Sequence, residues 1–213
     1  MSEIDTSSKV TEKKTDENEQ ILGGTTGNRH FLKIKLLPLV LTVVVFVLDQ
    51  GTKLLIVKTI PPYTIGASFF GDFLRIIHVY NPGIAFSMGN SLPDTLRSLL
   101  FAITPLIVLV IVLTVYFRND DFTFFQRWAI AGIVGGGLGN IYDRFFRPEG
   151  VVDFIDVKFY GLFGLERWPT FNVADAAVLI CGFLLIISFV RVMVKESREQ
   201  KVGDSGGSAP VQE

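Results

Sequence analysis

The chain places long apolar segments between short polar ones, after about thirty polar residues at its start. Four apolar segments stand out, at residues 36–57, 98–117, 128–141 and 174–194. The second has no charged residue, and a helix of about twenty residues rises about 30 Å, which matches the hydrocarbon thickness of a bilayer. The third segment is shorter and rich in glycine. We expect all four segments to be transmembrane helices, since buried helices of soluble proteins seldom stay uncharged over such lengths.

The remaining parts of the chain are predicted to be two outer loops and two tails. Residues 58–95 are rich in aromatic and branched side chains punctuated by glycine and proline, which indicates short strands in a small extracytoplasmic β-sheet. Residues 142–173 form the second outer loop. The polar stretches 1–30 and 198–213 are predicted to be disordered cytoplasmic tails. The sequence therefore predicts a mainly α integral membrane protein whose four-helix transmembrane domain occupies residues 31–197.

Basic residues beside the apolar segments predict the orientation in the membrane. If there are four spans, the basic residues of the short flanks gather on one side, and that side is predicted to be cytoplasmic. These residues are Lys33, Lys35, Arg118, Arg127, Arg191, Lys195, Arg198 and Lys201. Both termini are then cytoplasmic and the two longer loops face outward. The outer loops also contain lysine and arginine, so the asymmetry is moderate.

Composition excludes several classes of protein. With 49% hydrophobic residues, 19% charged residues and a mean hydropathy of +0.43, the chain is not disordered throughout. Its one cysteine, Cys181, excludes an intrachain disulfide scaffold and a cysteine-ligated zinc site. Two histidines argue against a histidine-rich metal centre, and a net charge of −1 gives no global electrostatic reason to bind nucleic acid.

Polar residues cluster at the outward ends of the apolar segments. Ionisable groups at such positions usually face a protein interior or a wet cavity and mark function, although each one taken alone can instead be a helix cap or an interface residue. The set consists of Asp49, Gln50, Lys53, Asn140, Asp143, Arg144, Asp153, Asn172 and Asp175. Because they gather at one end of the spans, a shared site is the favoured interpretation.

Two of these carboxylates suggest a specific chemistry. Asp153 lies in the apolar sequence VVDFI, where burial should raise its pKa, and Asp175 lies in the first turn of the last helix. If the two carboxyl groups meet, they cannot easily both ionise, so one holds a proton while the other accepts one. Such a pair can activate a water against a peptide carbonyl and protonate the leaving amine, as aspartic proteases do.

Three other interpretations are open at this point. A small proton or cation transporter can use membrane carboxylates, but it would be expected to distribute them along a path, often in repeated halves. A membrane scaffold would use them only as caps. An intramembrane aspartyl protease with a Gly-x-Gly-Asp signature is disfavoured because the motif is absent. The glycine-rich GIVGGGLGN resembles a phosphate loop only superficially, and we expect its glycines to permit close helix packing.

Five ordered motifs give the chain a family resemblance. They are DQGTK at 49–53, NPGIAFSM at 81–88, GGGLGNIYDR at 135–144, VVDFID at 151–156 and FNVADAAV at 171–178. With these motifs the chain resembles the lipoprotein signal peptidases (signal peptidase II), which are bacterial integral-membrane aspartic proteases. The resemblance spans residues 36–194 and implies four transmembrane helices, cytoplasmic termini and a small sheet at the extracytoplasmic face of the cytoplasmic (inner) membrane.

The resemblance also implies roles for individual residues. Asp153 and Asp175 match the catalytic aspartates of the family. The family's substrate-binding positions fall here on Asp49, Lys53, Asn81, Gly83, Asn140, Arg144 and Asn172. Asp143 is expected to brace these polar groups. The implied substrates are diacylglyceryl-modified prolipoproteins, cut just before the lipidated cysteine, with membrane lipid around the enzyme and no metal or other cofactor. Peptide-like inhibitors of the family are expected to bind the aspartate pair.

Two stretches depart from what the family needs. Residues 143–153 are slightly longer than usual and contain Arg147, Pro148 and Glu149. The aromatic stretch 157–170 is expected to lie along the membrane interface. The extra residues in these two stretches are not motif residues, so we expect them to affect substrate access and inhibitor fit rather than the chemistry.

Overall fold

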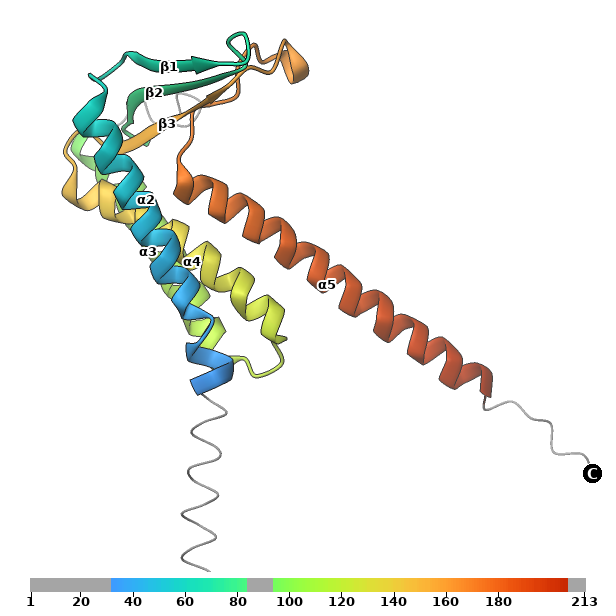
Figure 1. The fold of residues 1–213 in the computed structure, drawn as a ribbon. Helices are drawn as coiled ribbons and strands as arrows, with labels where there is room; N and C mark the ends of the chain where they lie inside the picture. Colours follow the sequence, from blue (N-terminus) through green and yellow to red (C-terminus); the bar gives the residue numbers. More distant parts are fainter. Residues whose placement is uncertain (1–31, 84–93, 207–213) are drawn as a thin grey trace, which may run out of the picture.

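The computed structural model describes residues 32–83 and 94–206, and shows four long helices with a small sheet across one end of them (Figure 1). The helices are α2 (Leu39–Thr59), α3 (Asp94–Arg118), α4 (Phe124–Phe146) and α5 (Val173–Gly206). A π-helical turn, η1 (Leu32–Leu36), precedes α2. The four apolar segments of the sequence therefore form helices; α2 has nearly the length of its apolar segment, and α3, α4 and α5 are longer than theirs.

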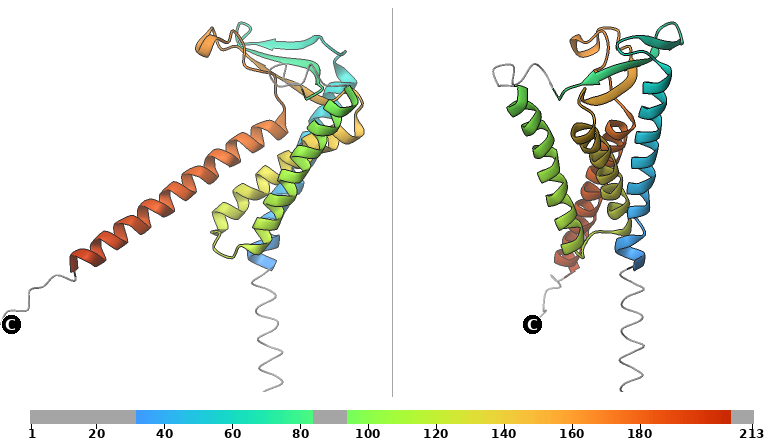
Figure 2. Two further views of the ribbon diagram at one scale, coloured as in Figure 1. Left: turned by 180° about the vertical axis from the view of Figure 1, so that it is seen from behind. Right: turned by 90° about the vertical axis from the view of Figure 1, so that its left-hand side faces the viewer.

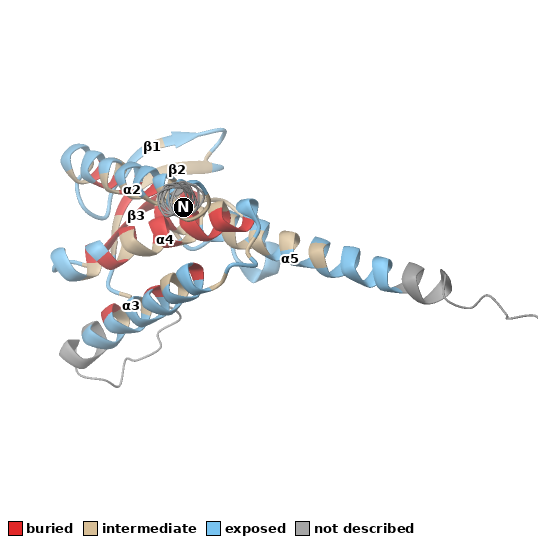
Figure 3. Cartoon of the chain, turned by 90° about the horizontal axis from the view of Figure 1, so that it is seen from below, coloured by how far each residue is buried: buried red, intermediate tan, exposed pale blue. Residues whose placement is uncertain are grey.

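Helix α4 is the centre of the bundle and packs against α2, α3 and α5. In the right-hand view of Figure 2, it lies between α2 and α3, while α5 runs behind it. A capping box starts α4, because the Thr123 side chain accepts from the Gln126 backbone and the Gln126 side chain accepts from the Thr123 backbone. Figure 3 shows the buried positions concentrated on α4 and on the side of α2 that faces it.

The glycines of α4 allow this close packing, as expected from the sequence. A Cβ on Gly136 would lie 2.4 Å from the Ala174 carbonyl oxygen of α5, and one on Gly135 would lie 2.8 Å from the Thr42 carbonyl oxygen of α2. Only a residue without a side chain lets the backbones approach so closely. GIVGGGLGN is therefore a helix-packing surface and not a phosphate-binding loop.

The outer surfaces of the helices are apolar, as a lipid environment requires. Leu55 of α2, Ile111 of α3 and Leu179 of α5 are among many large exposed hydrophobic side chains. Three helical stretches are long and apolar enough to cross a membrane: Lys33–Thr59, Leu99–Arg118 and Val173–Gln200. Helix α4 has sufficient length, at 23 residues, but glycines and polar ends lower its hydropathy. The fourth span therefore stays a prediction.

The sheet has three antiparallel strands in the order β1-β2-β3. Strands β1 (Ile65–Phe69) and β2 (Leu74–Asn81) lie in the first loop, where short strands were expected. Strand β3 (Val151–Val157) and the 3-10 turn η2 (Leu162–Gly164) belong to the second loop, for which no strand was predicted. The sheet packs on the end of α2, because Val152 and Phe154 form a small core with Ile56.

Some boundaries of the sequence-based domain scheme differ from the observed elements. Helix α4 continues to Phe146, into the stretch that was assigned to the second loop, and α5 continues to Gly206, beyond residue 197. Residues 1–30 and the second half of the NPGIAFSM motif lie outside the described residues. Residues 198–206, predicted to be disordered, are thus helical, whereas the tails at 1–30 and 207–213 and their cytoplasmic location stay predictions.

Candidate active site

A buried ion cluster joins α2 to α4 just below the sheet. Asp49 and Lys53 are one turn apart on α2, with the Lys53 ammonium 2.8 Å from Asp49 Oδ2. The same ammonium lies 2.8 Å from Asp143 Oδ2 of α4 and donates to Asn140 Oδ1 at 2.9 Å. The three charged side chains are fully buried. Charges in such a setting persist only when they are paired and hydrogen-bonded, so this cluster fixes α2 and α4 relative to each other.

Asp49 also binds the start of α5. Its Oδ1 accepts the Ala174 backbone N–H at 3.0 Å, which is one of the N–H groups that an α-helix leaves without an intrahelical partner. A carboxylate at a helix N-terminus is further favoured by the helix dipole. One acidic side chain of α2 thereby positions the turn of α5 that contains Asp175.

Asn172 caps α5 and connects the two candidate catalytic aspartates. Its side-chain oxygen accepts the Asp175 backbone N–H at 3.0 Å, and its own backbone N–H donates to Asp175 Oδ2 at 3.1 Å, which makes a reciprocal capping box. Its side-chain amide donates to Asp153 Oδ1 at 2.7 Å. Asn172 is therefore the N-cap of α5, and the same side chain bridges Asp153 and Asp175.

Asparagines hold the remaining oxygens of the two carboxyl groups. Asn140 Nδ2 donates to Asp175 Oδ1 at 2.7 Å, and Asn81 Nδ2 of β2 donates to Asp153 Oδ2 at 3.0 Å. Gly83 joins this end of β2, where its N–H donates to Asn81 Oδ1 at 2.9 Å with a φ of 89° that favours glycine. The two carboxyl groups are thus held from four elements, namely β2, β3, α4 and α5.

The electrostatics of Asp153 differ from those of an ordinary carboxylate. It is 3% exposed, and burial raises its pKa to about 7. Burial is the largest cause of this shift and the charge of Asp175 contributes to it, while the amides of Asn81 and Asn172 oppose it because they favour the carboxylate. Near neutral pH, Asp153 can therefore either hold or release a proton, which is what acid–base chemistry requires.

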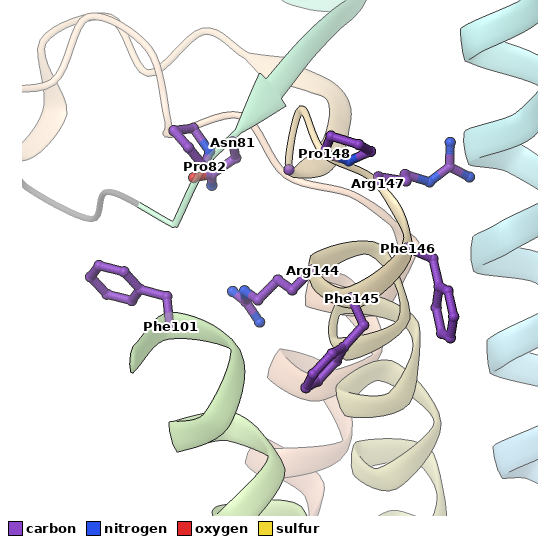
Figure 4. A pocket seen from close by; sticks show the side chains of 9 residues that line it. Asn81, Pro82, Phe101, Arg144, Phe145, Phe146, Arg147 and Pro148 are labelled. Atoms are coloured by element: carbon purple, nitrogen blue, oxygen red, sulfur yellow. The ribbon is translucent and has the colours of Figure 1, made fainter. Parts of the chain in front are cut away.

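Arg144 lies beside the pair in a cavity of about 280 Å³ (Figure 4). Its guanidinium is close enough to interact with the charges of Asp153 and Asp175, and its buried Nε has no hydrogen-bond partner among the described residues. In Figure 4 its side chain points toward Phe101 of α3, across the cavity. The wall of the cavity is formed by Asn81, Pro82, Phe101, Arg144, Phe145, Phe146, Arg147, Pro148 and Gly150.

The structure brings the sequence-predicted residues together. Eight of them belong to one hydrogen-bonded network, Gly83 is attached to it, and Arg144 lies next to it. The network consists of Asp49, Lys53, Asn81, Asn140, Asp143, Asp153, Asn172 and Asp175. These residues come from segments more than 120 positions apart in the chain, as between Asp49 and Ala174.

Two members of the network were given no individual role from the sequence: Gln50 was named only among the polar residues at the helix ends, and Arg147 only as part of the stretch 143–153. Gln50 donates to Asp49 Oδ2, to the Gly139 carbonyl and to Asp143 Oδ1 at 3.0, 3.1 and 3.2 Å. Arg147 donates to Asp143 Oδ1 at 2.8 Å. The one sequence signal for Arg147 is its spacing of four from Asp143, which places the two on one face of α4.

Known proteins resemble the chain over most of its length. A family model described as peptidase A8, signal peptidase (SPase) II, matches residues 41–191. A lipoprotein signal peptidase of Treponema pallidum (strain Nichols) is 51% identical over 175 residues, which cover 82% of this chain and 94% of that protein. A lipoprotein signal peptidase of Borrelia turicatae (strain 91E135) is 52% identical over 139 residues, or 65% of this chain and 81% of that protein.

Solved structures resemble the fold as well. A bacterial membrane enzyme determined by the in meso method at 1.9 Å resolution matches with a TM-score of 0.61 and 30% identity, covering 71% of this chain and 91% of that one. A second such enzyme, at 2.3 Å resolution, matches with a TM-score of 0.60 and 29% identity, covering 72% and 87% of the two chains.

Proposed function

The chain belongs to the signal peptidase II family, and we propose that it is an aspartic endopeptidase that removes the signal peptide from diacylglyceryl-modified prolipoproteins, just before the lipidated cysteine. Membership of the family supports a protease that acts on prolipoproteins in a membrane. It also sets aside the proton or cation transporter, since the relatives are peptidases. Beyond family membership, we propose that Asp153 and Asp175 are the catalytic pair, that the cut falls before the lipidated cysteine, and that the substrate must be lipidated.

One observation supports the aspartic mechanism above all others. The Asn172 side-chain amide donates to Asp153 at 2.7 Å, while its backbone N–H and side-chain oxygen both engage Asp175. A single residue thus bridges two acidic side chains, and Asn81, which donates to Asp153, lines the neighbouring cavity. Their charges interact, and the pKa of Asp153 of about 7 is near the pH at which such a pair has to exchange protons.

The pair performs the reaction in two steps, each with two proton transfers. With one proton shared between Asp153 and Asp175, the ionised carboxylate takes a proton from a water as its oxygen attacks the scissile carbonyl carbon, and the protonated carboxyl gives its proton to the carbonyl oxygen. A tetrahedral diol results. In the second step a carboxylate removes a proton from one hydroxyl of this diol while the other carboxyl protonates the nitrogen. The C–N bond then breaks, releasing an amine and an acid.

Neighbouring polar groups position the substrate for this reaction. Arg144 lines the cavity, with a buried Nε that has no hydrogen-bond partner among the described residues, so it can donate to a backbone carbonyl near the scissile bond. Holding the peptide extended against the pair reduces the entropy lost on reaching the transition state. Asn81 and Asn140 hold the carboxyl groups in place during the reaction.

The position of the site in the molecule suits a substrate that is anchored in lipid. Asp153 lies on β3 and Asp175 in the first turn of α5, at the end of the bundle that the sheet covers, while the exposed faces of the helices are apolar (Figures 1 and 3). A signal peptide is a membrane helix and the diacylglyceryl group stays in the bilayer, so the scissile bond is delivered at this level. We place this end at the extracytoplasmic face of the cytoplasmic membrane, with both termini in the cytoplasm.

A gel-shift assay in detergent tests the proposal. Purified wild-type protein is given a lipid-modified prolipoprotein or the same protein without lipid, beside the variants Asp153→Asn and Asp175→Asn. Asp156→Asn is the matched control, because Asp156 is a buried aspartate on β3 that pairs with Arg167 outside the site. We expect wild type and Asp156→Asn to cleave the lipidated substrate alone. Cleavage by a folded Asp153→Asn or Asp175→Asn would refute the aspartate pair.

A further inference from the structure

The buried ion cluster beneath the sheet is balanced only when Arg147 is counted. Lys53 lies 2.8 Å from both Asp49 and Asp143, and all three side chains are fully buried. Two carboxylates and one ammonium leave one negative charge, and a buried charge without a partner is costly. Arg147 Nε lies 2.8 Å from Asp143 Oδ1, on the oxygen that Lys53 does not contact. With Arg147 the cluster has two carboxylates and two cations.

The end of α4 fixes Arg147 in this position. Its backbone N–H donates to the Asp143 carbonyl at 2.8 Å, and Pro148 follows, which cannot continue the helix ladder. In Figure 4 the Arg147 side chain points away from the cavity and toward α2, opposite to Arg144. Arg144 thus faces the cavity, whereas Arg147 faces the ion cluster.

Asp143 is connected to the first catalytic aspartate through the backbone of β3. Its Oδ2 accepts the Val152 backbone N–H at 3.4 Å, and Val152 is the residue before Asp153. The Val152 carbonyl in turn accepts the side-chain amide of Asn172 at 3.4 Å. A shift of Asp143 would therefore displace the part of β3 that carries Asp153.

Asp143 is connected to the second aspartate through side chains. Lys53, which Asp143 holds, donates to Asn140 Oδ1 at 2.9 Å, and Asn140 Nδ2 donates to Asp175 Oδ1 at 2.7 Å. The carboxylate of Asp143 therefore contributes to the placement of both members of the pair. Its charge, unless neutralised, also adds to the negative potential around them.

We infer that Arg147 is a positioning residue of the reaction, which neutralises Asp143 and so sets the pH at which the aspartate pair loses its shared proton. This inference rests on the proposed aspartic mechanism. The charged groups around Asp143 are Asp49 and Lys53 of α2, Arg144 of α4, Arg147 just after α4, Asp153 of β3 and Asp175 of α5. Removal of the Arg147 charge makes this environment more negative and favours the protonated pair.

The expected change is an upward shift in the titration of the pair. A unit charge about 10 Å away, screened by an effective dielectric constant of about 20 to 40, changes a titration midpoint by about 0.5–1 pH unit. Arg147→Gln should show this shift. Arg147→Lys keeps the charge and should stay near the wild-type midpoint. Asp143→Asn in the Arg147→Gln background balances the cluster again and should restore the midpoint, which a purely steric role for Arg147 does not predict.

The experiment measures protonation and cleavage separately. Infrared spectroscopy of the purified protein in detergent follows the protonated-carboxyl band with pH, and subtraction of Asp153→Asn assigns the band to the pair. The control is Arg167→Gln, because Arg167 binds the buried Asp156 at 2.7 Å on the opposite face of β3 from Asp153. The pH profile of cleavage is recorded for the same variants, after gel filtration has shown that each is folded.

The outcomes test the role of Arg147 separately from the proposed function. An upward shift in Arg147→Gln alone, reversed by the second substitution, supports the inference. An unchanged midpoint in Arg147→Gln, or an equal shift in Arg167→Gln, would overturn it. Absence of cleavage by the wild-type protein would instead count against the proposed function, while the infrared titration would still decide whether Arg147 controls the pair.

Discussion

Asn81 offers a direct test of how the protonation of Asp153 is controlled. The Asn81 side-chain amide donates to Asp153 Oδ2 at 3.0 Å, and this bond favours the carboxylate over the carboxylic acid. Burial acts in the opposite direction and is the larger effect, so the pKa of Asp153 is raised from 3.8 to about 7. Asn81→Ala removes the donor and leaves the burial, so the pKa of Asp153 should rise further.

The size of the shift follows from the strength of the bond. A hydrogen bond to a charged group is worth about 1.5–3 kcal/mol, and the lower value applies here because Asn81 itself is exposed to solvent. Water replaces part of the lost interaction, which leaves roughly 1 kcal/mol, and about 1.4 kcal/mol corresponds to one pH unit. The midpoint should therefore move upward by about 0.5–1 pH unit.

The assay is the pH dependence of kcat/KM for cleavage of a lipid-modified prolipoprotein. For the wild-type protein, activity should fall as the pH rises through the upper pKa of the pair, because the shared proton is lost. In Asn81→Ala the maximal rate should drop, since a positioning contact is gone, but the alkaline fall should begin at higher pH. Asn119→Ala, beyond the far end of α3, is the control and should leave the profile unchanged. An alkaline limb that stays in place or moves to lower pH in Asn81→Ala would refute this account of Asp153.

Three further changes test the buried interactions. Lys53→Met leaves Asp49 buried without its cation and should lower the free energy of unfolding by about 3–5 kcal/mol. Adding Asp49→Asn should restore most of this loss. Thermal unfolding in detergent measures both variants, and additive losses would contradict the pairing. Gly136→Ala should lower the free energy of unfolding by about 1–3 kcal/mol and reduce cleavage, because its Cβ would lie 2.4 Å from the Ala174 carbonyl oxygen. The control Gly51→Ala, whose Cβ would have nothing within 4 Å, should be neutral or slightly stabilising. Asp153→Asn should be more stable than the wild type at pH 8 but not at pH 4. Because the pKa of Asp153 is raised in the folded protein, the wild type loses up to about 4 kcal/mol of stability as the pH rises from 3.8 toward 7. Equal melting temperatures of the two proteins at pH 8 would contradict the burial of this charge.

The helices could be predicted from the sequence because helices with apolar outer surfaces appear as long hydrophobic segments. Leu55, Ile111 and Leu179 are exposed and apolar, so their helices read as continuous hydrophobic runs. Strand β3 gave no comparable signal. Val151 to Phe154 are all buried, so the strand lacks the alternation that marks a half-exposed strand, and its aspartate suggests a loop. The pairing with β2 is what makes this segment a strand.

The candidate site was predictable by residue type but not by its contacts. Asp153 and Asp175 stand out because acidic residues beside apolar segments are costly and therefore usually functional. Gln50 looks like any polar residue near a helix end, and its bond to Asp143 spans 93 positions of the chain. Such contacts depend on how α2 and α4 pack, which the glycines of α4 decide, and no local pattern contains that information.

The same packing explains how an acid with a pKa near 7 can persist in this protein. The buried cluster of Asp49, Lys53, Asp143 and Arg147 pairs its charges within the bundle, so it anchors α2 to α4 without a net charge. In the described part of the chain the Asp153 carboxyl group accepts hydrogen bonds from the amides of Asn81 and Asn172 and from no cationic side chain, and burial therefore dominates its pKa. The cluster of four charged side chains thus stabilises the bundle, whereas the neighbouring pair of Asp153 and Asp175 serves the proposed reaction. A substitution that unbalances this cluster should change the pH dependence of the aspartate pair indirectly, which Arg147→Gln tests, whereas Asn81→Ala removes a direct partner of Asp153.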